Sequence, residues 1–281
     1  MSRTSKSALT EEHLRRFCEF LYDRTGMLFG ESKRYYIERR LHDRLKATGS
    51  LSYETYFMLL RTDPAEVATV VDAFTVNETY FYREEHQFRC LTRDLLPRIV
   101  QTRTPGDKIR IWCAPCSTGE EPYSVAIWLL ENWPLVDAYN VEIVGSDIDA
   151  TVLRAAQVGR YGKRALGKLP GPLVDTYFEP VGDSEWTLIQ DLRESVLFTP
   201  ANLVELALTP PGGLFDIVFC RNVLIYFDEQ SRLLAAENLY RSLVPGGFLC
   251  LGHTESMARI DERFEPKRFS DAIVYQRGGR G

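Results

Sequence analysis

The spacing of apolar residues divides the chain into a helical beginning and a mixed remainder. In the first part, apolar side chains recur every three or four residues, as on the buried face of an amphipathic helix. Residues that cap helices, such as Thr10 and Asp63, precede two of these stretches, and Gly26 follows the first. The pattern predicts a small all-α domain with helices over residues 10–26, 32–47, 52–60 and 64–74.

From residue 108 onward, short apolar runs alternate with helical patterns. Alternation of this kind is typical of an α/β fold with a parallel sheet and right-handed crossovers. The tail at 269–276 is expected to return as an edge strand. The predicted strands cover residues 108–112, 141–146, 195–199, 215–220 and 247–252, and the predicted helices cover 120–132, 149–158 and 229–243.

Two segments depart from this alternation. Residues 160–194 contain two β-like runs separated by Pro180-Val181-Gly182-Asp183-Ser184, which predicts an inserted antiparallel hairpin. Residues 76–106 connect the two parts of the chain and continue as one long helix over 84–100. They begin with a stretch that is both aromatic and polar, which suits either the lining of a site or a packed connection.

The composition is that of an ordinary globular protein, with 281 residues, 44% hydrophobic and 26% charged. No apolar run approaches the ~18 residues of a transmembrane helix, and the polar N-terminus lacks the apolar core of a signal peptide. Six cysteines without a framework spacing favour reduced thiols and therefore a cytoplasmic location. The net charge of −5 argues against general nucleic-acid binding.

Positive charge is concentrated near the N-terminus, where residues 1–50 contain 11 Lys and Arg against 7 Asp and Glu. In the predicted second helix, Lys33, Arg40 and Arg44 lie along one ridge, because steps of seven and four residues return to nearly the same angle. From charge alone, a solvated helix face is the better interpretation. The alternative is a surface that docks an acidic partner.

The turn after the first predicted strand is the strongest indication of a ligand site. Small residues around Ser117 and Gly119 form the turn, and Glu120 and Glu121 open the next helix. Acids at that position favour a ligand with hydroxyls, an amine or a positive centre over a phosphate. Asp147 ends the next strand, where an acid either binds ribose hydroxyls or caps the following helix.

Other chemistries have weaker support. The run Trp112-Cys113-Ala114-Pro115-Cys116 is similar to a thioredoxin motif, but the two glutamates that follow would raise a thiol pKa. No second close Cys/His pair completes a zinc site, so no metal is expected. The four histidines are scattered and no Gly-x-Ser-x-Gly elbow is present, so a serine hydrolase is not indicated.

Five stretches of the chain are informative as a set. In chain order they are Asn77-Glu-Thr-Tyr-Phe-Tyr-Arg83, Ser117-Thr-Gly-Glu-Glu-Pro-Tyr-Ser124, Ser146-Asp-Ile-Asp149, Phe219-Cys-Arg-Asn-Val-Leu-Ile-Tyr-Phe-Asp228 and Pro245-Gly-Gly-Phe-Leu-Cys-Leu-Gly-His253. Together they resemble, in family order, the bacterial chemotaxis receptor methyltransferases, which methylate glutamate side chains of methyl-accepting chemoreceptors with S-adenosylmethionine. The resemblance implies a Rossmann-like class I methyltransferase domain over 107–281, with an antiparallel β-subdomain inserted at about 160–194. It also implies a small all-α docking domain over 1–75 and a segment over 76–106 that contributes to the cofactor site.

The resemblance implies roles for individual residues. Arg83 and Tyr226 are the candidates for the catalytic centre, Arg83 to orient a carboxylate and Tyr226 to line the methyl channel. Lys33, Arg40 and Arg44 become a docking surface for the chemoreceptor. S-adenosylmethionine, with S-adenosylhomocysteine as its product, is expected to contact Asn77, Thr79, Arg83, Glu121, Asp147, Asn202, Leu203, Asn222 and Val223.

The expected reaction is esterification of specific glutamates in the cytoplasmic domain of chemoreceptors, which sets signalling adaptation. A glutamate side chain has a pKa of about 4.3 and is already a nucleophile at pH 7, so no general base is needed. The protein is expected to be a monomer, with no nucleic acid and no membrane insertion. Two alternatives stay open, namely a sensor of the cofactor without turnover and a methyltransferase acting on a different acid or small molecule.

Overall fold

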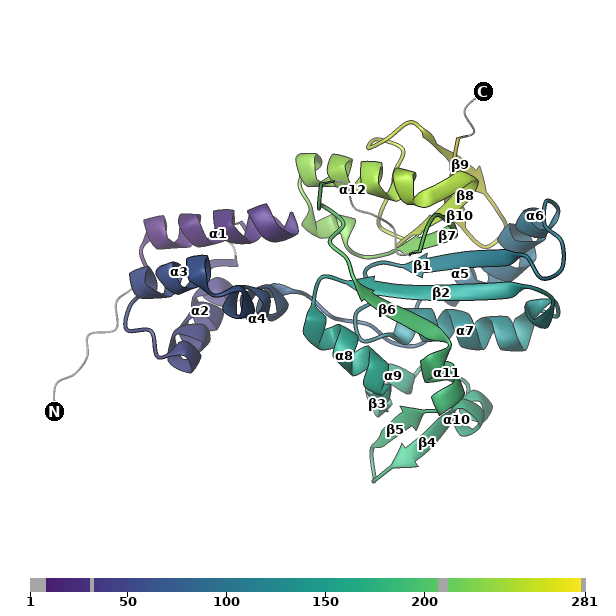
Figure 1. Cartoon of the computed structure of the whole chain (residues 1–281), viewed down its shortest axis with the longest axis horizontal. Helices are drawn as coiled ribbons and strands as arrows, with labels where there is room; N and C mark the ends of the chain where they lie inside the picture. Colours follow the sequence, from purple (N-terminus) through teal and green to yellow (C-terminus); the bar gives the residue numbers. More distant parts are fainter. Residues whose placement is uncertain (1–8, 31–32, 207–211, 279–281) are drawn as a thin grey trace. The chain divides into compact units, whose positions relative to one another are not determined.

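The computed structural model describes residues 9–30, 33–206 and 212–278 (Figure 1). The chain forms two compact units. The first consists of Met1–Val76 and the short segment Tyr226–Asp228. The second consists of Asn77–Ile225 and Glu229–Gly281.

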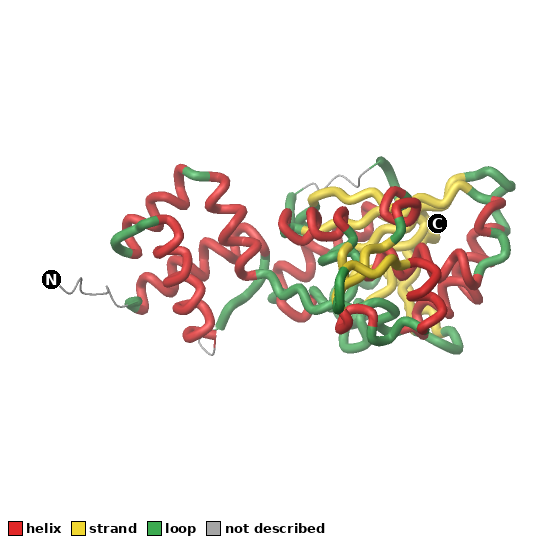
Figure 2. The backbone as a smooth tube through the Cα atoms, turned by 90° about the horizontal axis from the view of Figure 1, so that it is seen from below, coloured by secondary structure: helices red, strands yellow, loops and turns green. Residues whose placement is uncertain are grey.

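The first unit is built from helices, drawn in red in Figure 2. Thr10 caps the first helix and Gly26 ends it in the left-handed conformation, as their places in the sequence predict. Asp63 caps the fourth helix, which begins with a proline. The expected start of the second helix at Ser32 lies outside the described residues. The helices are α1 (Glu11–Thr25), α2 (Arg34–Thr48), α3 (Tyr53–Thr62) and α4 (Pro64–Phe74).

The predicted apolar faces of these helices form the core of the first unit. Phe17 and Phe74 are fully buried with their ring centroids 5.1 Å apart, and Ile37 and Leu41 bury the inner face of α2. The segment Tyr226–Asp228 joins this unit through a bridge between Met27 and Phe227.

The second unit contains a seven-stranded sheet in the order β6-β2-β1-β7-β8-β10-β9. The first five strands in that order are parallel, and β10 runs antiparallel to both of its neighbours, β8 and β9. Figure 1 shows α7 and α12 on opposite faces of the sheet. The strands are β1 (Lys108–Cys113), β2 (Asn140–Asp147), β6 (Val196–Pro200), β7 (Phe215–Cys220), β8 (Leu243–Leu251), β9 (Phe264–Arg268) and β10 (Ile273–Arg277).

The helices of the second unit are close to their predicted bounds, with one exception. The predicted long helix over 84–100 contains a π-helical turn, η2, in its middle. Pro97 has no N–H to donate within the helix, and the N–H of Leu96 bonds instead to the carbonyl of Leu91. The helices are α5 (Glu85–Cys90), η2 (Leu91–Leu95), α6 (Leu96–Val100), α7 (Glu120–Asn132), η3 (Val136–Ala138), α8 (Ala150–Val158), η4 (Leu224–Tyr226) and α12 (Glu229–Ser242).

The C-terminal part of the sheet differs from its prediction. The tail was expected to supply one edge strand over 269–276, but β10 lies between β8 and β9, and β9 is the edge. The pattern missed β9 because its sequence, Phe-Glu-Pro-Lys-Arg, is largely polar. Strand β8 also begins four residues early, because a register shift opposite Phe215 and Ile217 accommodates Pro245 and Gly246.

The predicted insertion forms a separate antiparallel sheet in the order β3-β5-β4. Strands β4 and β5 form the predicted hairpin, and β3 adds to it from the residues after α8. Its elements are β3 (Arg160–Gly162), α9 (Lys163–Leu166), α10 (Gly171–Tyr177), β4 (Phe178–Val181), β5 (Glu185–Leu188) and α11 (Gln190–Glu194).

A buried ion pair inside the first unit generates a prediction about stability. Both carboxylate oxygens of Glu66 accept hydrogen bonds from Arg44, at 2.9 and 2.5 Å, and Oε1 also accepts one from Tyr56 at 2.6 Å. Glu66→Ala leaves a partly buried guanidinium and a buried hydroxyl without this partner. We expect the free energy of unfolding, measured with urea, to fall by about 3 kcal/mol.

Glu19→Ala is the matched control, because Glu19 pairs with Arg15 on the exposed face of α1. Exposed helix pairs contribute little, so this variant is expected to unfold close to the wild type. Equal urea midpoints for the two variants would contradict the structural role of Glu66.

Candidate functional site

The carboxyl ends of three neighbouring parallel strands form the candidate site. Cys113, the last residue of β1, pairs with Gly145 of β2 on one side and with Phe219 of β7 on the other. The loops that follow these strands therefore leave the sheet at one edge. In open α/β sheets, this edge beside the crossover is where ligands bind.

The turn between β1 and α7 has a constrained backbone. Ser117 has φ 47° and Gly119 has φ 92°, both in the left-handed region. A Cβ at Gly119 would lie 2.9 Å from the Cβ of Ala156, so only glycine fits this close approach. The N–H of Ser117 donates to Asp147 Oδ2 at 2.8 Å, which fixes the turn to the end of β2.

Asp147 is buried at the end of β2 and is not the cap of the following helix. That role belongs to Asp149, whose Oδ1 accepts the N–H groups of Thr151 and Val152. Asp147 accepts instead from the backbone of Ser117 and of Asp149. Burial, opposed by these hydrogen bonds, raises the pKa of Asp147 to about 6.

Glu121 lies in the first turn of α7. Its Oε2 accepts a hydrogen bond from Arg221 Nη1 at 2.6 Å. Its Oε1 is buried and has no hydrogen-bond partner among the described residues. Burial raises the pKa of Glu121, and the nearby Arg221 opposes that shift. A buried acceptor of this kind is satisfied by a donor on a ligand.

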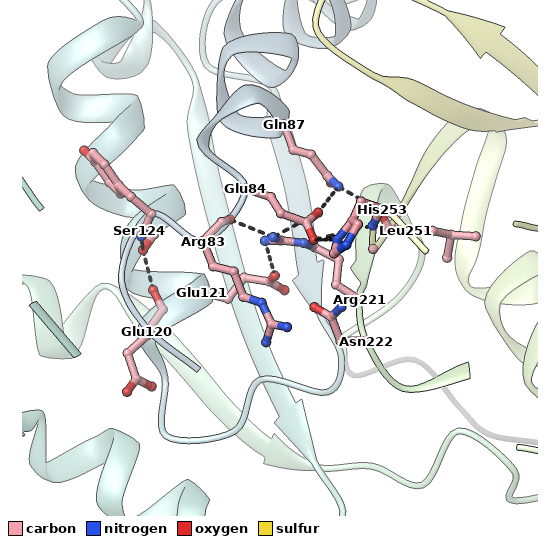
Figure 3. Close-up of polar contacts among 12 residues, drawn as sticks. Arg83, Glu84, Gln87, Glu120, Glu121, Ser124, Arg221, Asn222, Leu251 and His253 are labelled. Carbon is pink, nitrogen blue, oxygen red and sulfur yellow. Dashed lines mark hydrogen bonds and ion pairs between the residues drawn. The ribbon is translucent and has the colours of Figure 1, made fainter. Parts of the chain in front are cut away.

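Arg221 is the centre of a buried polar network, shown in Figure 3. It follows β7, and besides Glu121 it reaches the residues before α5. Its Nη2 donates to the carbonyl of Arg83 at 2.6 Å and lies 3.3 Å from Glu84 Oε2. Glu84 in turn lies 2.7 Å from His253 Nδ1 and accepts from Gln87 at 2.8 Å.

Glu255 holds the loop after β7, a role that the sequence did not indicate. Its carboxylate accepts the N–H groups of Asn222, Leu224 and Gly252, at 2.7, 2.8 and 2.9 Å. Asn222 has φ 60°, in the left-handed region, which asparagine adopts more readily than most residues other than glycine. This carboxylate therefore stabilises the backbone of the predicted contact residues Asn222 and Val223.

The segment from Asn77 to Arg83 reaches the same edge. Asn77 Nδ2 donates to Asp149 Oδ2 at 2.9 Å. Arg83 is half-buried and donates to the carbonyl of Glu78. Burial raises the pKa of Glu121, and the charge of Arg83 weakly opposes that shift. Thr79 is half-buried in the same segment. Both interpretations of this stretch, the lining of a site and a packed connection, stay predictions.

The remaining predicted residues lie on other elements. Asn202 and Leu203 follow β6, and the carbonyl of Leu203 accepts a hydrogen bond from Asn238 at 2.8 Å. Tyr226 ends η4 and groups with the first unit, where its carbonyl accepts the N–H of Leu28. The structure therefore brings Asp147, Glu121 and Asn222 to one sheet edge, while Tyr226 is assigned to a different unit.

The predicted basic ridge on α2 is not a continuous free surface. Lys33 is exposed, but Arg44 is bound by Glu66 inside the first unit. Arg40 lies 4.4 Å from the Tyr36 ring centroid and donates to the carbonyl of Ala73. The helical spacing alone does not reveal that two of these three cations, Arg40 and Arg44, contact other residues of their own domain. The exposed cations of α2 and its cap residue are Lys33, Arg39 and Lys46.

The thiols and possible metal ligands add no further chemistry. Cys113 and Cys116 are buried free cysteines, and burial raises the pKa of both, so they do not form an activated dithiol. Within the described ranges, no group of three or more His, Cys, Asp and Glu is placed to hold a metal ion. None of the described helices is long and apolar enough to cross a membrane.

Comparison with known proteins is consistent with this geometry. Residues 12–75 match the all-alpha domain of CheR methyltransferases, and residues 77–273 match their SAM-binding domain. Chemotaxis protein methyltransferase 2 of Vibrio cholerae is 43% identical, over 97% of this chain and 95% of that protein. Chemotaxis protein methyltransferase 2 of Pseudomonas aeruginosa is 39% identical, over 88% of this chain and 87% of that protein. The chain belongs to the CheR methyltransferase family.

Proposed function

We propose that the protein transfers a methyl group from S-adenosylmethionine to glutamate side chains in the cytoplasmic domain of a bacterial chemoreceptor. The names of its relatives support a role in chemotaxis. The observation that carries the proposal is the unpartnered Oε1 of Glu121 at the same sheet edge as the buried Asp147. Such a pair suits a ligand with an amine and ribose hydroxyls.

The residues at this edge fit the cofactor. Glu121 Oε1 would accept a hydrogen bond from the ammonium of its methionine part, and the Asp147 carboxylate would accept from ribose hydroxyls. Ser117 Oγ is a second buried atom without a partner among the described residues. Asn222 and Val223 flank the site from the loop after β7. Asn77, Thr79, Asn202 and Leu203 complete the proposed set of cofactor contacts.

The main task of the protein's residues in this reaction would be to position the two reactants, because no proton has to be removed. When bound, S-adenosylmethionine supplies an electrophilic methyl group on its sulfonium. A glutamate with a pKa of about 4.3 is ionised at pH 7, so its carboxylate oxygen would accept the methyl group without a base, while the methyl carbon–sulfur bond breaks and S-adenosylhomocysteine leaves. The half-buried guanidinium of Arg83 would orient a carboxylate, and Tyr226 is the second candidate for contact with the reacting groups.

Docking of the receptor is proposed for α2, through its exposed cations. Lys33, Arg39 and Lys46 face solvent, whereas Arg40 and Arg44 are engaged within the domain. An acidic stretch of a receptor would be attracted to this helix.

A methyl-transfer assay tests the proposal. The protein is incubated with methyl-labelled S-adenosylmethionine and a chemoreceptor cytoplasmic fragment, and base-labile release of labelled methanol is measured. We expect volatile label, because a carboxyl methyl ester hydrolyses in base. A fragment with its candidate glutamates replaced by alanine is the matched control and is expected to release none. Cofactor binding without methanol from any receptor fragment would contradict the proposal.

Cofactor affinity is expected to depend on pH. The raised pKa of about 6 means that Asp147 is ionised at pH 8 and protonated at pH 5. The ionised form accepts the ribose hydroxyls, so affinity is full well above pH 6 and falls to about half at pH 6. Below it, affinity falls by up to about tenfold per pH unit. Calorimetric titration of S-adenosylhomocysteine between pH 5 and 8 measures this.

Asp147→Asn is the matched variant for the pH experiment, since it removes the charge and keeps the shape. At pH 8 we expect it to bind S-adenosylhomocysteine roughly tenfold more weakly than the wild type. Its affinity is expected to depend less steeply on pH, with the remaining slope due to Glu121. An unchanged affinity at pH 8 would refute the assignment of Asp147 to the ribose.

A further inference from the structure

Arg221 is not among the residues that the cofactor is expected to contact, yet its guanidinium makes three polar contacts within the site. It is 4% exposed and follows directly after β7. Its two terminal nitrogens reach Glu121 of α7, the carbonyl of Arg83, and Glu84 at the start of α5. One guanidinium thus joins three elements that meet at the carboxyl edge of the sheet (Figure 3).

Glu84, the second carboxylate beside this guanidinium, is itself held in place. Glu84 caps α5 with φ 57°, in the left-handed region. Its carboxylate is held by His253 Nδ1 at 2.7 Å and by Gln87 Nε2 at 2.8 Å. Gln87 also donates to the carbonyl of Leu251 at 2.7 Å, which connects Glu84 to the end of β8. Arg221 is therefore clamped between two carboxylates, one of which is anchored to β8.

We propose that Arg221 is a positioning residue, which holds the carboxylate of Glu121 so that Oε1 faces the ammonium of the cofactor, while Glu84 holds Arg221 from behind. The inference rests on the proposed role of Glu121. It assigns to Arg221 a specific effect on the amino-acid end of the cofactor. The adenosine end, which is assigned to Asp147, does not contact this network.

The charged groups around Glu121 explain why Arg221 would keep its carboxylate ionised. The charged groups that face Glu121 are Arg83, Glu84 and Arg221. The thiols of Cys113, Cys116, Cys220 and Cys250 lie near this network, and burial raises the pKa of each, so they stay neutral. Without Arg221, two buried carboxylates would be left close together. Their repulsion would favour protonation of Glu121, and a protonated Glu121 binds an ammonium poorly.

Two probes separate positioning from general damage. S-adenosylhomocysteine carries the amine, and 5′-methylthioadenosine is the same nucleoside thioether without the amino-acid part. For Arg221→Met in the full-length protein, we expect roughly ten- to hundredfold weaker binding of S-adenosylhomocysteine at pH 7. We expect binding of 5′-methylthioadenosine to change by less than about twofold. Isothermal titration calorimetry measures both.

A double variant tests the charge argument. Glu84→Gln removes one of the two carboxylates, so Arg221→Met combined with Glu84→Gln is expected to bind S-adenosylhomocysteine better than Arg221→Met alone. The affinity of Arg221→Met is also expected to recover as the pH is raised, because a higher pH favours the ionised form of Glu121. A purely structural role for Arg221 predicts neither recovery.

Arg110→Met is the matched control. Arg110 is also a buried arginine with an acidic partner, Glu142 at 2.9 Å, but it lies near the amino end of β1. We expect it to lose stability without changing the ratio of the two affinities. Arg221→Lys keeps the charge but not the fork, so it provides a milder variant with a smaller selective loss.

The outcomes distinguish this inference from the proposed function. Equal weakening of both probes by Arg221→Met and Arg221→Lys would overturn the positioning role. Selective loss of S-adenosylhomocysteine, with recovery in the double variant, would establish it. If that pattern appears while the wild type methylates no receptor fragment, the receptor assignment fails and the positioning role stands.

Discussion

The buried ion pair between Arg221 and Glu121 is the interaction on which the rest of the site depends. It joins the end of β7 to the first turn of α7, and through Glu84 and Gln87 it reaches the end of β8. Burying charges is costly unless each has a partner. Here two carboxylates share one guanidinium, and Glu121 Oε1 lacks a partner among the described residues. The proposed ammonium of the cofactor would be the donor that this oxygen lacks.

Backbone strain is concentrated at the same edge. The described residues other than glycine with positive φ are Tyr82, Glu84, Ser117 and Asn222, and all lie in the segments that surround this network. Strained conformations persist where the surrounding contacts over-determine them. Glu255 supplies such contacts to Asn222, and Asp147 supplies them to Ser117. These hydrogen bonds within the protein therefore fix the backbone of the site without a ligand.

Local signals made most of the fold predictable from the sequence. Caps at Thr10 and Asp63 and the apolar runs of the central strands depend on neighbours in the chain. The π-helical turn, strand β9 and the place of β10 depend on distant partners, and the pattern missed them. The same limit applies to side chains: spacing placed Arg44 on a ridge, but only the packing of α4 shows that Glu66 binds it. Glu255 was missed because the N–H groups that donate to its carboxylate lie up to 33 residues away in the sequence.

A crystal structure with S-adenosylhomocysteine bound tests the central claim most directly. The account predicts the ligand's amine within about 3 Å of Glu121 Oε1. It also predicts the ribose hydroxyls on Asp147, with the bond between Arg221 and Glu121 intact. An amine that lies away from Glu121, or a Glu121 that leaves Arg221 to reach the ligand, would contradict it.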